Sequence, residues 1–343
     1  MSDPRPLLAI TIGDPAGIGP EITAKAIADK EIVALCRPLA VGDAGIMRDI
    51  VERCQLPLKV QTVDDPAAGD YQEGNLVVLD LGNVDPAAFR FNTVAAMTGR
   101  ASYDYVTTAI DLALAGKVDG TVTGPIHKEA LRLAGCDYAG HTEIYADRTG
   151  TKDYTMMLAE GGFRVVHVST HVSLAEAIRR VTRDRVLKVI RLAHHALRDI
   201  SIDIPRIAVA GLNPHAGENG LFGREEIDEI IPAIKDAQAE GIAAEGPFPP
   251  DTIFPKMRGG QYDVVVCMYH DQGHIPTKLL GFDYDHASGE WRAMAGVNIT
   301  LGLPIVRVSV DHGVAFDKGG LNTANPGSML EAIRYAARLC GAR

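Results

Sequence analysis

The sequence predicts an α/β protein built from parallel βαβ units, in two domains or in one large unit with two lobes. Short apolar runs alternate with segments of helical periodicity, which is typical of a parallel sheet with helices on both faces. The 343 residues exceed what one ordinary hydrophobic core requires. An apolar fraction of 46% with 23% charged residues is ordinary for a globular protein.

The first element is a strand over Leu7–Ile12, and a glycine-rich turn separates it from a helix that begins near Pro20. Proline suits the first helical turn, where its missing N–H costs nothing. Further strands are predicted at Leu39–Val41, Leu76–Leu79, Gly120–Thr123, Tyr154–Leu158, Arg164–Val168, Arg206–Ala210, Val264–Cys267 and Ile305–Val310. Further helices are predicted at Ala44–Cys54, Thr98–Ala115, Arg183–Arg198, Arg224–Gln238 and Ser328–Leu339.

The remaining segments suggest where the chain divides. Pro57–Asp70 has the composition of a loop, and a glycine-rich turn near Tyr138 separates two elements. We therefore expect one lobe from residues 1–137 plus 305–343 and a second lobe from residues 138–304.

Charge and cysteine content exclude several classes of protein. A formal net charge of −10 argues against a general nucleic-acid binder, which needs a basic surface. The five cysteines are scattered without a C-x-x-C motif, as expected for reduced thiols. The apolar run at the N-terminus is too short for a signal peptide, and no run approaches the roughly 18 apolar residues that span a bilayer. We expect a soluble, cytoplasmic protein without a membrane partner.

Met268–Lys278 carries the densest group of polar side chains, directly after the predicted strand Val264–Cys267. It contains His270, Asp271 and Lys278. The carboxyl ends of strands are where open α/β sheets bind ligands. Burying so many polar groups is costly unless partners satisfy them. We interpret this segment as an active-site loop.

Three histidines, His171, His215 and His270, each stand just past a predicted strand. Neutral imidazoles are the commonest metal ligands, and three of them leave coordination positions open for a substrate. Their separation along the chain forms no compact metal motif. If their strands are neighbours, the histidines converge at one edge of the sheet. A metal site and ordinary hydrogen-bonding histidines both remain open.

The turn Gly13–Glu21 lacks the dinucleotide fingerprint, because Pro20 follows Gly17-Ile18-Gly19. It could receive an anion at the following helix or simply be a tight βα connection. Thr142 could cap a helix with Glu143 in its first turn. The adjacent His141 is harder to explain, although a lone histidine is usually an ordinary hydrogen-bonding residue.

Arg307 lies inside a Val/Ile strand, where a guanidinium needs an anionic ligand or a structural salt bridge. Asn298 would supply a neutral polar group nearby. Both readings of Arg307 remain open.

Taken together, these motifs resemble the 4-hydroxythreonine-4-phosphate dehydrogenase family of vitamin B6 (pyridoxine) biosynthesis and its paralogues. Several long motifs in the same order are far more specific than any one of them. The matching segments are Gly13–Glu21, Thr123–Lys128, Gly140–Glu143, Gly211–Glu218, Gly246–Thr252, Met268–Gly273, Val297–Pro304 and Ser309–Gly313.

The resemblance implies a fold similar to isocitrate and isopropylmalate dehydrogenases, with two lobes, a cleft and an NAD (or NADP) site that is not a Rossmann domain. It also implies a homodimer whose active site is shared across the interface. A divalent metal (Zn, Mg, Co or Mn) would be held by His171, His215 and His270, one of them from the partner subunit. Substrate contacts would be His141, Thr142, Lys278, Asn298 and Arg307. Asp271 is the candidate for holding or deprotonating groups around the metal, and Lys278 is the second catalytic candidate.

The implied reaction oxidises the C3 hydroxyl of a four-carbon acid 4-phosphate, and decarboxylation follows. Three departures look more like the paralogues that oxidise D-threonate or D-erythronate 4-phosphate. His274 and Ile275 replace the usual continuation of the Met268–Gly273 motif, Asp283–Ala295 is interposed, and Gly319–Asn325 lacks a basic residue. Competing alternatives are an acyl-phosphate transferase on a related fold, which would not require three metal-binding histidines, and a metal-dependent hydrolase, which would not need NAD.

Overall fold

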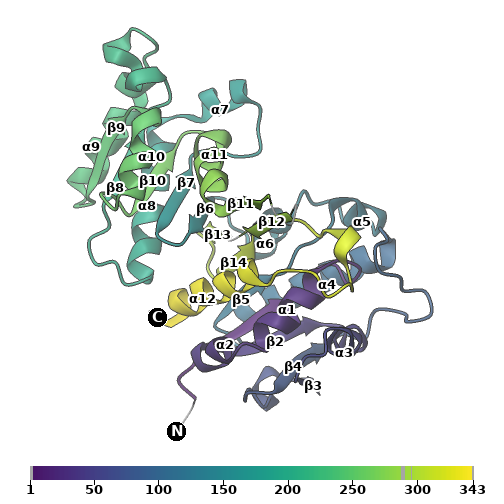
Figure 1. Ribbon diagram of the computed structural model, residues 1–343. Helices are drawn as coiled ribbons and strands as arrows, with labels where there is room; N and C mark the ends of the chain where they lie inside the picture. The colour runs from purple at the N-terminus through teal and green to yellow at the C-terminus, as the bar shows by residue number, and fades with distance from the viewer. Residues whose placement is uncertain (1–2, 287–289, 295, 342–343) are drawn as a thin grey trace.

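The computed structural model describes residues 3–286, 290–294 and 296–341. A twelve-stranded sheet runs through the molecule in the order β3-β4-β2-β1-β5-β14-β13-β6-β7-β10-β8-β9. Figure 1 shows two lobes, one with β1–β5 and the other with β6–β10, and β13 and β14 lie between them. The two-lobed α/β architecture is therefore confirmed, while the exact boundaries of the lobes stay a prediction.

The strands of the large sheet are short, and most are buried. They are β1 (Leu7–Thr11), β2 (Arg37–Gly42), β3 (Lys59–Val63), β4 (Asn75–Asp80), β5 (Gly120–Thr123), β6 (Thr155–Glu160), β7 (Phe163–His167), β8 (Ile207–Ala210), β9 (Ala244–Phe248), β10 (Val264–Cys267), β13 (Val297–Leu301) and β14 (Val306–Val310). Every residue of β1, β5, β8, β10 and β14 is buried, as expected for strands covered on both faces. Each strand predicted from the sequence overlaps one of these.

Helices pack around the sheet. They are α1 (Gly19–Ile27), α2 (Lys30–Leu35), α3 (Ala44–Arg53), α4 (Ala96–Leu114), α5 (Lys128–Leu133), α6 (His141–Thr149), α7 (Leu174–Arg180), α8 (Arg183–Asp199), α9 (Ile231–Ala239), α10 (Pro250–Arg258), α11 (His270–Gly281) and α12 (Gly327–Gly341). Short helical turns lie at η1 (Pro66–Ala68), η2 (Pro214–Gly220) and η4 (Phe316–Lys318), and η3 (Glu226–Ile230) is a π-helix. Among the described residues, no helix is long and apolar enough to cross a membrane.

The centre of the sheet is not parallel, which corrects the expectation of parallel units throughout. Strand β13 pairs antiparallel with both β14 and β6, and β6 pairs antiparallel with β7. Only Gly161 and Gly162 join β6 to β7, and such a short link can make a hairpin but not a parallel crossover.

Two local predictions were wrong, and a third needs a refinement. Lys59–Val63, expected in a loop, is the edge strand β3, whose partial exposure hides the apolar signature of a buried strand. The predicted loop at Met268–Lys278 is largely helix α11, in which Gln272 accepts a hydrogen bond from the backbone N–H of Met268 at 2.7 Å. The helix predicted at Arg224–Gln238 is confirmed, with its first turn wound as the π-helix η3 before α9.

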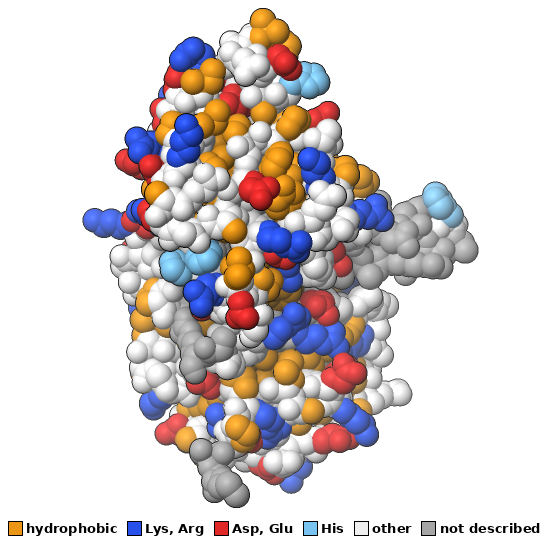
Figure 2. Space-filling model, turned by 90° about the vertical axis from the view of Figure 1, so that its left-hand side faces the viewer, with side chains coloured by type: hydrophobic (Ala, Val, Ile, Leu, Met, Phe, Trp, Pro, Cys, Tyr) orange, Lys and Arg blue, Asp and Glu red, His pale blue; other side chains and the backbone are white. Residues whose placement is uncertain are grey.

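The interposed segment Asp283–Ala295 forms, together with Phe282, a separate two-stranded hairpin of β11 (Phe282–Asp285) with β12 (Glu290–Met294). Residues 287–289 and 295 of this segment lie outside the described residues. On the face that Figure 2 shows, basic and acidic side chains are interspersed. Surface ion pairs such as Arg206 with Asp263, at 2.8 Å, fit this mixture.

Candidate active site

Arg307 is buried at the centre of the sheet without an acidic partner among the described residues. It lies on β14 with 3% of its surface exposed. One terminal nitrogen donates to the hydroxyl of Thr300 at 2.9 Å and the other to that of Thr123 at 3.1 Å. Its Nε finds no hydrogen-bond acceptor in the described part of the chain. Burial lowers the pKa of Arg307 to about 10, so the side chain stays charged at neutral pH. A buried guanidinium whose hydrogen-bond partners among the described residues are two hydroxyls is well suited to bind an anion.

Two further predicted substrate contacts also have buried polar atoms without a partner among the described residues. These atoms are Nε2 of His141 and Oδ1 of Asn298. Burial, and then the charge of Arg307, hold the pKa of His141 well below its usual range, so its imidazole is neutral. Buried polar atoms normally find a partner in the folded protein, so unpaired atoms on neighbouring elements indicate a ligand site.

Helix α6 presents His141 and Thr142 in its first turn. The helix begins at His141, and its N-cap residue Gly140 contributes no side-chain hydrogen bond. Thr142 is therefore not the helix cap that the sequence suggested. Farther along the same helix, the ring of Tyr145 lies 5.6 Å from the guanidinium carbon of Arg307. One helix thus positions polar groups near the buried charge.

The strands that precede the three histidines are neighbours. Strand β10 pairs in parallel with β7 on one side and with β8 on the other, so their carboxyl ends meet at one edge of the sheet. The ring centroids of His171 and His270 lie 5.7 Å apart. Burial lowers the pKa of His171, which favours the neutral form that binds metals. These two imidazoles fit a shared divalent ion.

His215 does not join them within one chain. Its ring lies 6.2 Å from that of Phe222, and the described residues contain no group of three or more potential ligands arranged around a metal position. From His215 to Asn219 every residue is left-handed, with φ between 42° and 80°. This conformation costs roughly 1–2 kcal/mol per residue other than glycine, so the surrounding structure must hold it.

Glu226 anchors the residues that lead into this left-handed turn, a role that the sequence did not reveal. The carboxylate is buried and accepts hydrogen bonds from the backbone N–H of Leu212 at 2.8 Å and of Asn213 at 2.7 Å. It also accepts from the side-chain amide of Asn213 at 2.9 Å. A Cβ at Gly217 would lie 2.6 Å from the carboxylate, so this position in the turn requires glycine. Only the burial of Glu226 in the folded protein could have revealed this role.

Asp271 and Lys278 lie at the two ends of the polar segment on α11. Oδ1 of Asp271 is 2.6 Å from Nδ1 of His270, and because a carboxylate can only accept, Nδ1 carries the hydrogen. The Nε2 lone pair of His270 is then available to a metal. Lys278 pairs with the carboxylate of Asp311 and donates to its backbone carbonyl at 3.2 Å. Asp311, which follows β14, is a second residue that the sequence analysis did not single out.

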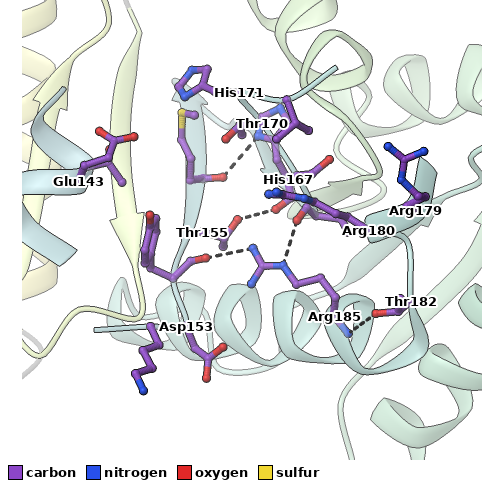
Figure 3. Close-up of a pocket in the computed structure, with 17 residues that line it drawn as sticks. Glu143, Asp153, Thr155, His167, Thr170, His171, Arg179, Arg180, Thr182 and Arg185 are labelled. Carbon is purple, nitrogen blue, oxygen red and sulfur yellow. Dashed lines mark hydrogen bonds between the residues drawn. The ribbon is translucent and has the colours of Figure 1, made fainter. Parts of the chain in front are cut away.

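A cavity of about 640 Å³ opens beside the predicted site. Thr142 and His171 line it, whereas Arg307, Asn298 and Lys278 do not. In Figure 3, Glu143 lies on one side of the cavity and Arg179 on the other. Arg185 donates to the backbone carbonyls of Val168 at 2.9 Å and Tyr154 at 3.0 Å, so it braces the cavity wall. The cavity brings together only part of the predicted site.

The Gly13–Glu21 turn packs as a tight βα connection. Gly13 has φ +71°, and a Cβ there would lie 2.3 Å from the carbonyl oxygen of Pro125. Glu21 is buried and accepts from the backbone N–H groups of Asn322 at 3.1 Å and Ala324 at 2.7 Å. The turn therefore joins the N-terminal strand to the C-terminal segment, which favours the structural interpretation.

Comparison with known proteins identifies the family. The chain matches the family described as pyridoxal phosphate biosynthetic protein PdxA over residues 34–336. It is 43% identical to the D-threonate 4-phosphate dehydrogenase of Cupriavidus necator over the full length of both chains. It is 45% identical to the 4-hydroxythreonine-4-phosphate dehydrogenase of Desulforapulum autotrophicum, over 98% of this chain and 96% of that protein. The crystal structure of the 4-hydroxythreonine-4-phosphate dehydrogenase from Klebsiella pneumoniae superposes with a TM-score of 0.84 at 42% identity, over 98% of this chain and 99% of that one.

The relatives confirm two of the sequence predictions, namely the oxidoreductase class and the family resemblance. Those named above are dehydrogenases, so the predicted oxidoreductase class is confirmed, in place of the transferase and hydrolase alternatives. The match extends over nearly the whole chain in sequence and in fold. The chain therefore belongs to the family of the pyridoxal phosphate biosynthetic protein PdxA.

Proposed function

We propose that this chain oxidises the C3 hydroxyl of a four-carbon acid 4-phosphate, with NAD (or NADP) as hydride acceptor and a divalent metal ion, and that the 3-oxo product loses carbon dioxide. The observation that carries the proposal is the buried Arg307, whose charge has no acidic partner among the described residues. An anionic substrate would supply that partner. The substrates in the names of the relatives are phosphorylated hydroxy acids, which have the required charge.

Each polar side chain of the site would bind a different group of the substrate. Arg307 would bind the phosphate or the carboxylate as a fork, and the Oδ1 atom of Asn298 would accept from a substrate hydroxyl. Neutral His141 and Thr142 would orient the same molecule from α6. Lys278 would balance the second anionic group after exchanging its partner Asp311 for the substrate.

The proposed metal site uses His171 and His270 of one subunit and His215 of the partner subunit. The short distance between the first two rings, and the separate position of His215 in the same chain, support this division. When bound, the ion supplies charge stabilisation at the substrate oxygens, and the nicotinamide accepts a hydride. Asp271 would hold the ring of His270 in its ligand tautomer. The active protein would then be a homodimer with shared sites.

D-threonate or D-erythronate 4-phosphate is the favoured substrate within this class. The departures at His274 and Ile275 and the interposed hairpin β11–β12 distinguish this chain from the vitamin B6 pattern. The named relatives include enzymes of both substrate types, at 43% and 45% identity, so the choice rests on these departures. These acids have a hydroxyl on the second carbon where 4-hydroxythreonine 4-phosphate has an amine.

A substrate panel tests the proposal. The purified protein is assayed with D-threonate, D-erythronate and 4-hydroxythreonine 4-phosphates, and NADH absorbance and released carbon dioxide are recorded. We expect the sugar-acid phosphates to be oxidised fastest, activity to disappear after chelation and a divalent ion to restore it. Preference for the amino acid phosphate would refute the substrate assignment, and activity that survives complete metal removal would refute the metal role.

A further inference from the structure

Helix α11 presents three polar side chains on one face. His270, His274 and Lys278 follow one another at intervals of four residues, which places them in one row along the helix. The proposed function uses the first and the last of these residues. His274 stands between them on the same helix. Any ligand that reaches from His270 to Lys278 would pass His274.

The imidazole of His274 stacks on that of His270. Their ring centroids are 3.6 Å apart and their planes differ by 9°. Nδ1 of His274 lies 2.9 Å from the backbone carbonyl oxygen of His270, and because a carbonyl can only accept, this nitrogen is the donor. A flat ring therefore covers one face of His270, and the hydrogen bond fixes its position.

A third imidazole, that of His167, packs against the ring of His274. The centroid of buried His167 lies 4.7 Å from that of His274, and its Nε2 has no partner among the described residues. Gly273 makes this packing possible, since a Cβ there would lie 2.5 Å from Nε2 of His167. The first turn of α11 thus sits directly against β7, which leaves His274 little freedom to move away from His270.

These contacts leave His270 with a defined orientation. Asp271 fixes the ring tautomer through Nδ1, and the face of His274 fixes the ring plane. Groups that orient a metal-binding histidine typically contribute 10–100-fold to metal affinity. We propose that His274 is a positioning residue, which holds the imidazole of His270 in the orientation needed to bind the metal ion. The inference rests on the proposed function, because it takes His270 as a metal ligand.

The test measures metal affinity directly. Wild type, His274→Ala and His274→Phe are titrated with Co²⁺ by calorimetry, and the visible spectrum of the bound ion is recorded. Phenylalanine keeps a flat face over His270, whereas alanine removes it. The matched control is His195→Ala, which deletes an exposed imidazole on α8. Thermal unfolding of the metal-free proteins reports any loss of folding.

We expect His274→Ala to weaken Co²⁺ binding by about 10–100-fold and to alter the spectrum, with the metal-free melting temperature nearly unchanged. His274→Phe should recover most of the affinity, and the control should match wild type. Equal Co²⁺ affinity in His274→Ala and wild type would overturn the inference. An equal loss of Co²⁺ affinity in His274→Ala and His274→Phe, together with a lower melting temperature, would also overturn it. Failure of the wild type itself to bind Co²⁺ would instead refute the proposed function.

Discussion

The imidazole rings of His171 and His270 lie 5.7 Å apart, although one follows β7 and the other follows β10. The two strands are paired in parallel, so the sheet itself brings the rings together. His215 follows the other neighbour of β10, but its left-handed turn carries it into a different environment. One chain therefore presents two ligands of the proposed site, and a second copy would supply the third.

Mixing inactive variants tests this division of ligands. We expect His171→Ala and His215→Ala to be inactive alone but to recover activity when they are co-expressed with different tags. In a mixed dimer, one site keeps His171 and His270 from one chain and His215 from the other. Because half of the dimers are mixed and one of their two sites is intact, about a quarter of wild-type activity should return.

The matched control is the pair His171→Ala with His270→Ala. Both changes fall on the same side of the proposed interface, so no mixed dimer contains an intact site and activity should stay absent. Recovery in the control pair, or its absence in the test pair, would show that the ligands are divided differently.

Replacing Arg307 should affect substrate binding and the stability of the folded protein in different ways. We expect Arg307→Met to reduce kcat/KM on the order of a hundredfold, because the substrate loses a buried charge-assisted contact. The free energy of unfolding should stay equal or rise, because the change removes a buried charge without an acidic partner among the described residues. Steady-state kinetics and urea unfolding measure the two effects. Arg148→Met, which removes an arginine paired with Asp111 at the surface, is the control. Undiminished kcat/KM would show that Arg307 does not bind the substrate.

Much of the site could be predicted because its residues follow the carboxyl ends of buried strands, which are recognisable in the sequence. Buried runs such as Val264–Cys267 identify strands, and polar residues at their carboxyl ends point to a shared edge. Arg307 stood out because a guanidinium inside a Val/Ile strand requires a partner. Both arguments use only the periodicity and the cost of burying charge.

Other parts depend on contacts that have no local signature. The left-handed turn at His215 is unfavourable by local preference, and Glu226 from a later helix anchors the residues that lead into it. Helix α11 was predicted as a loop because its sequence is rich in polar residues and contains Pro276. The antiparallel direction of β13 follows from its place between β6 and β14, which periodicity does not reveal.

Removing Glu226 should release the turn that carries His215. We expect Glu226→Ala to lower the free energy of unfolding by about 2–4 kcal/mol, because two partly buried N–H groups lose their acceptor. Glu226→Gln retains one oxygen and should cost less. Urea unfolding provides the measurement, and Glu240→Ala, which deletes the partner of Arg191 in a surface ion pair, provides the comparison. If Glu226→Ala were as stable as this comparison variant, the carboxylate would not be what holds the turn.

Asp14 should make stability depend on pH. Its carboxyl is fully buried, and burial raises its pKa from 3.8 to about 6. Between these values the folded state holds a proton that the unfolded state has released. The contribution of Asp14 to the free energy of unfolding should therefore fall by about 3 kcal/mol as pH rises from about 4 to 6. Above that range this contribution should no longer change with pH.

Asp14→Asn removes the titration but keeps the acceptor for the backbone N–H of Ala16, which lies 3.0 Å from Oδ1. The stability of the wild type relative to this variant should decline across the window, as measured by urea unfolding at a series of pH values. Asp85→Asn is the matched control, because exposed Asp85 makes the same kind of turn with Ala87 at 2.9 Å. A wild type that gained stability relative to Asp14→Asn between pH 4 and 6 would mean that the carboxyl is charged in the folded protein.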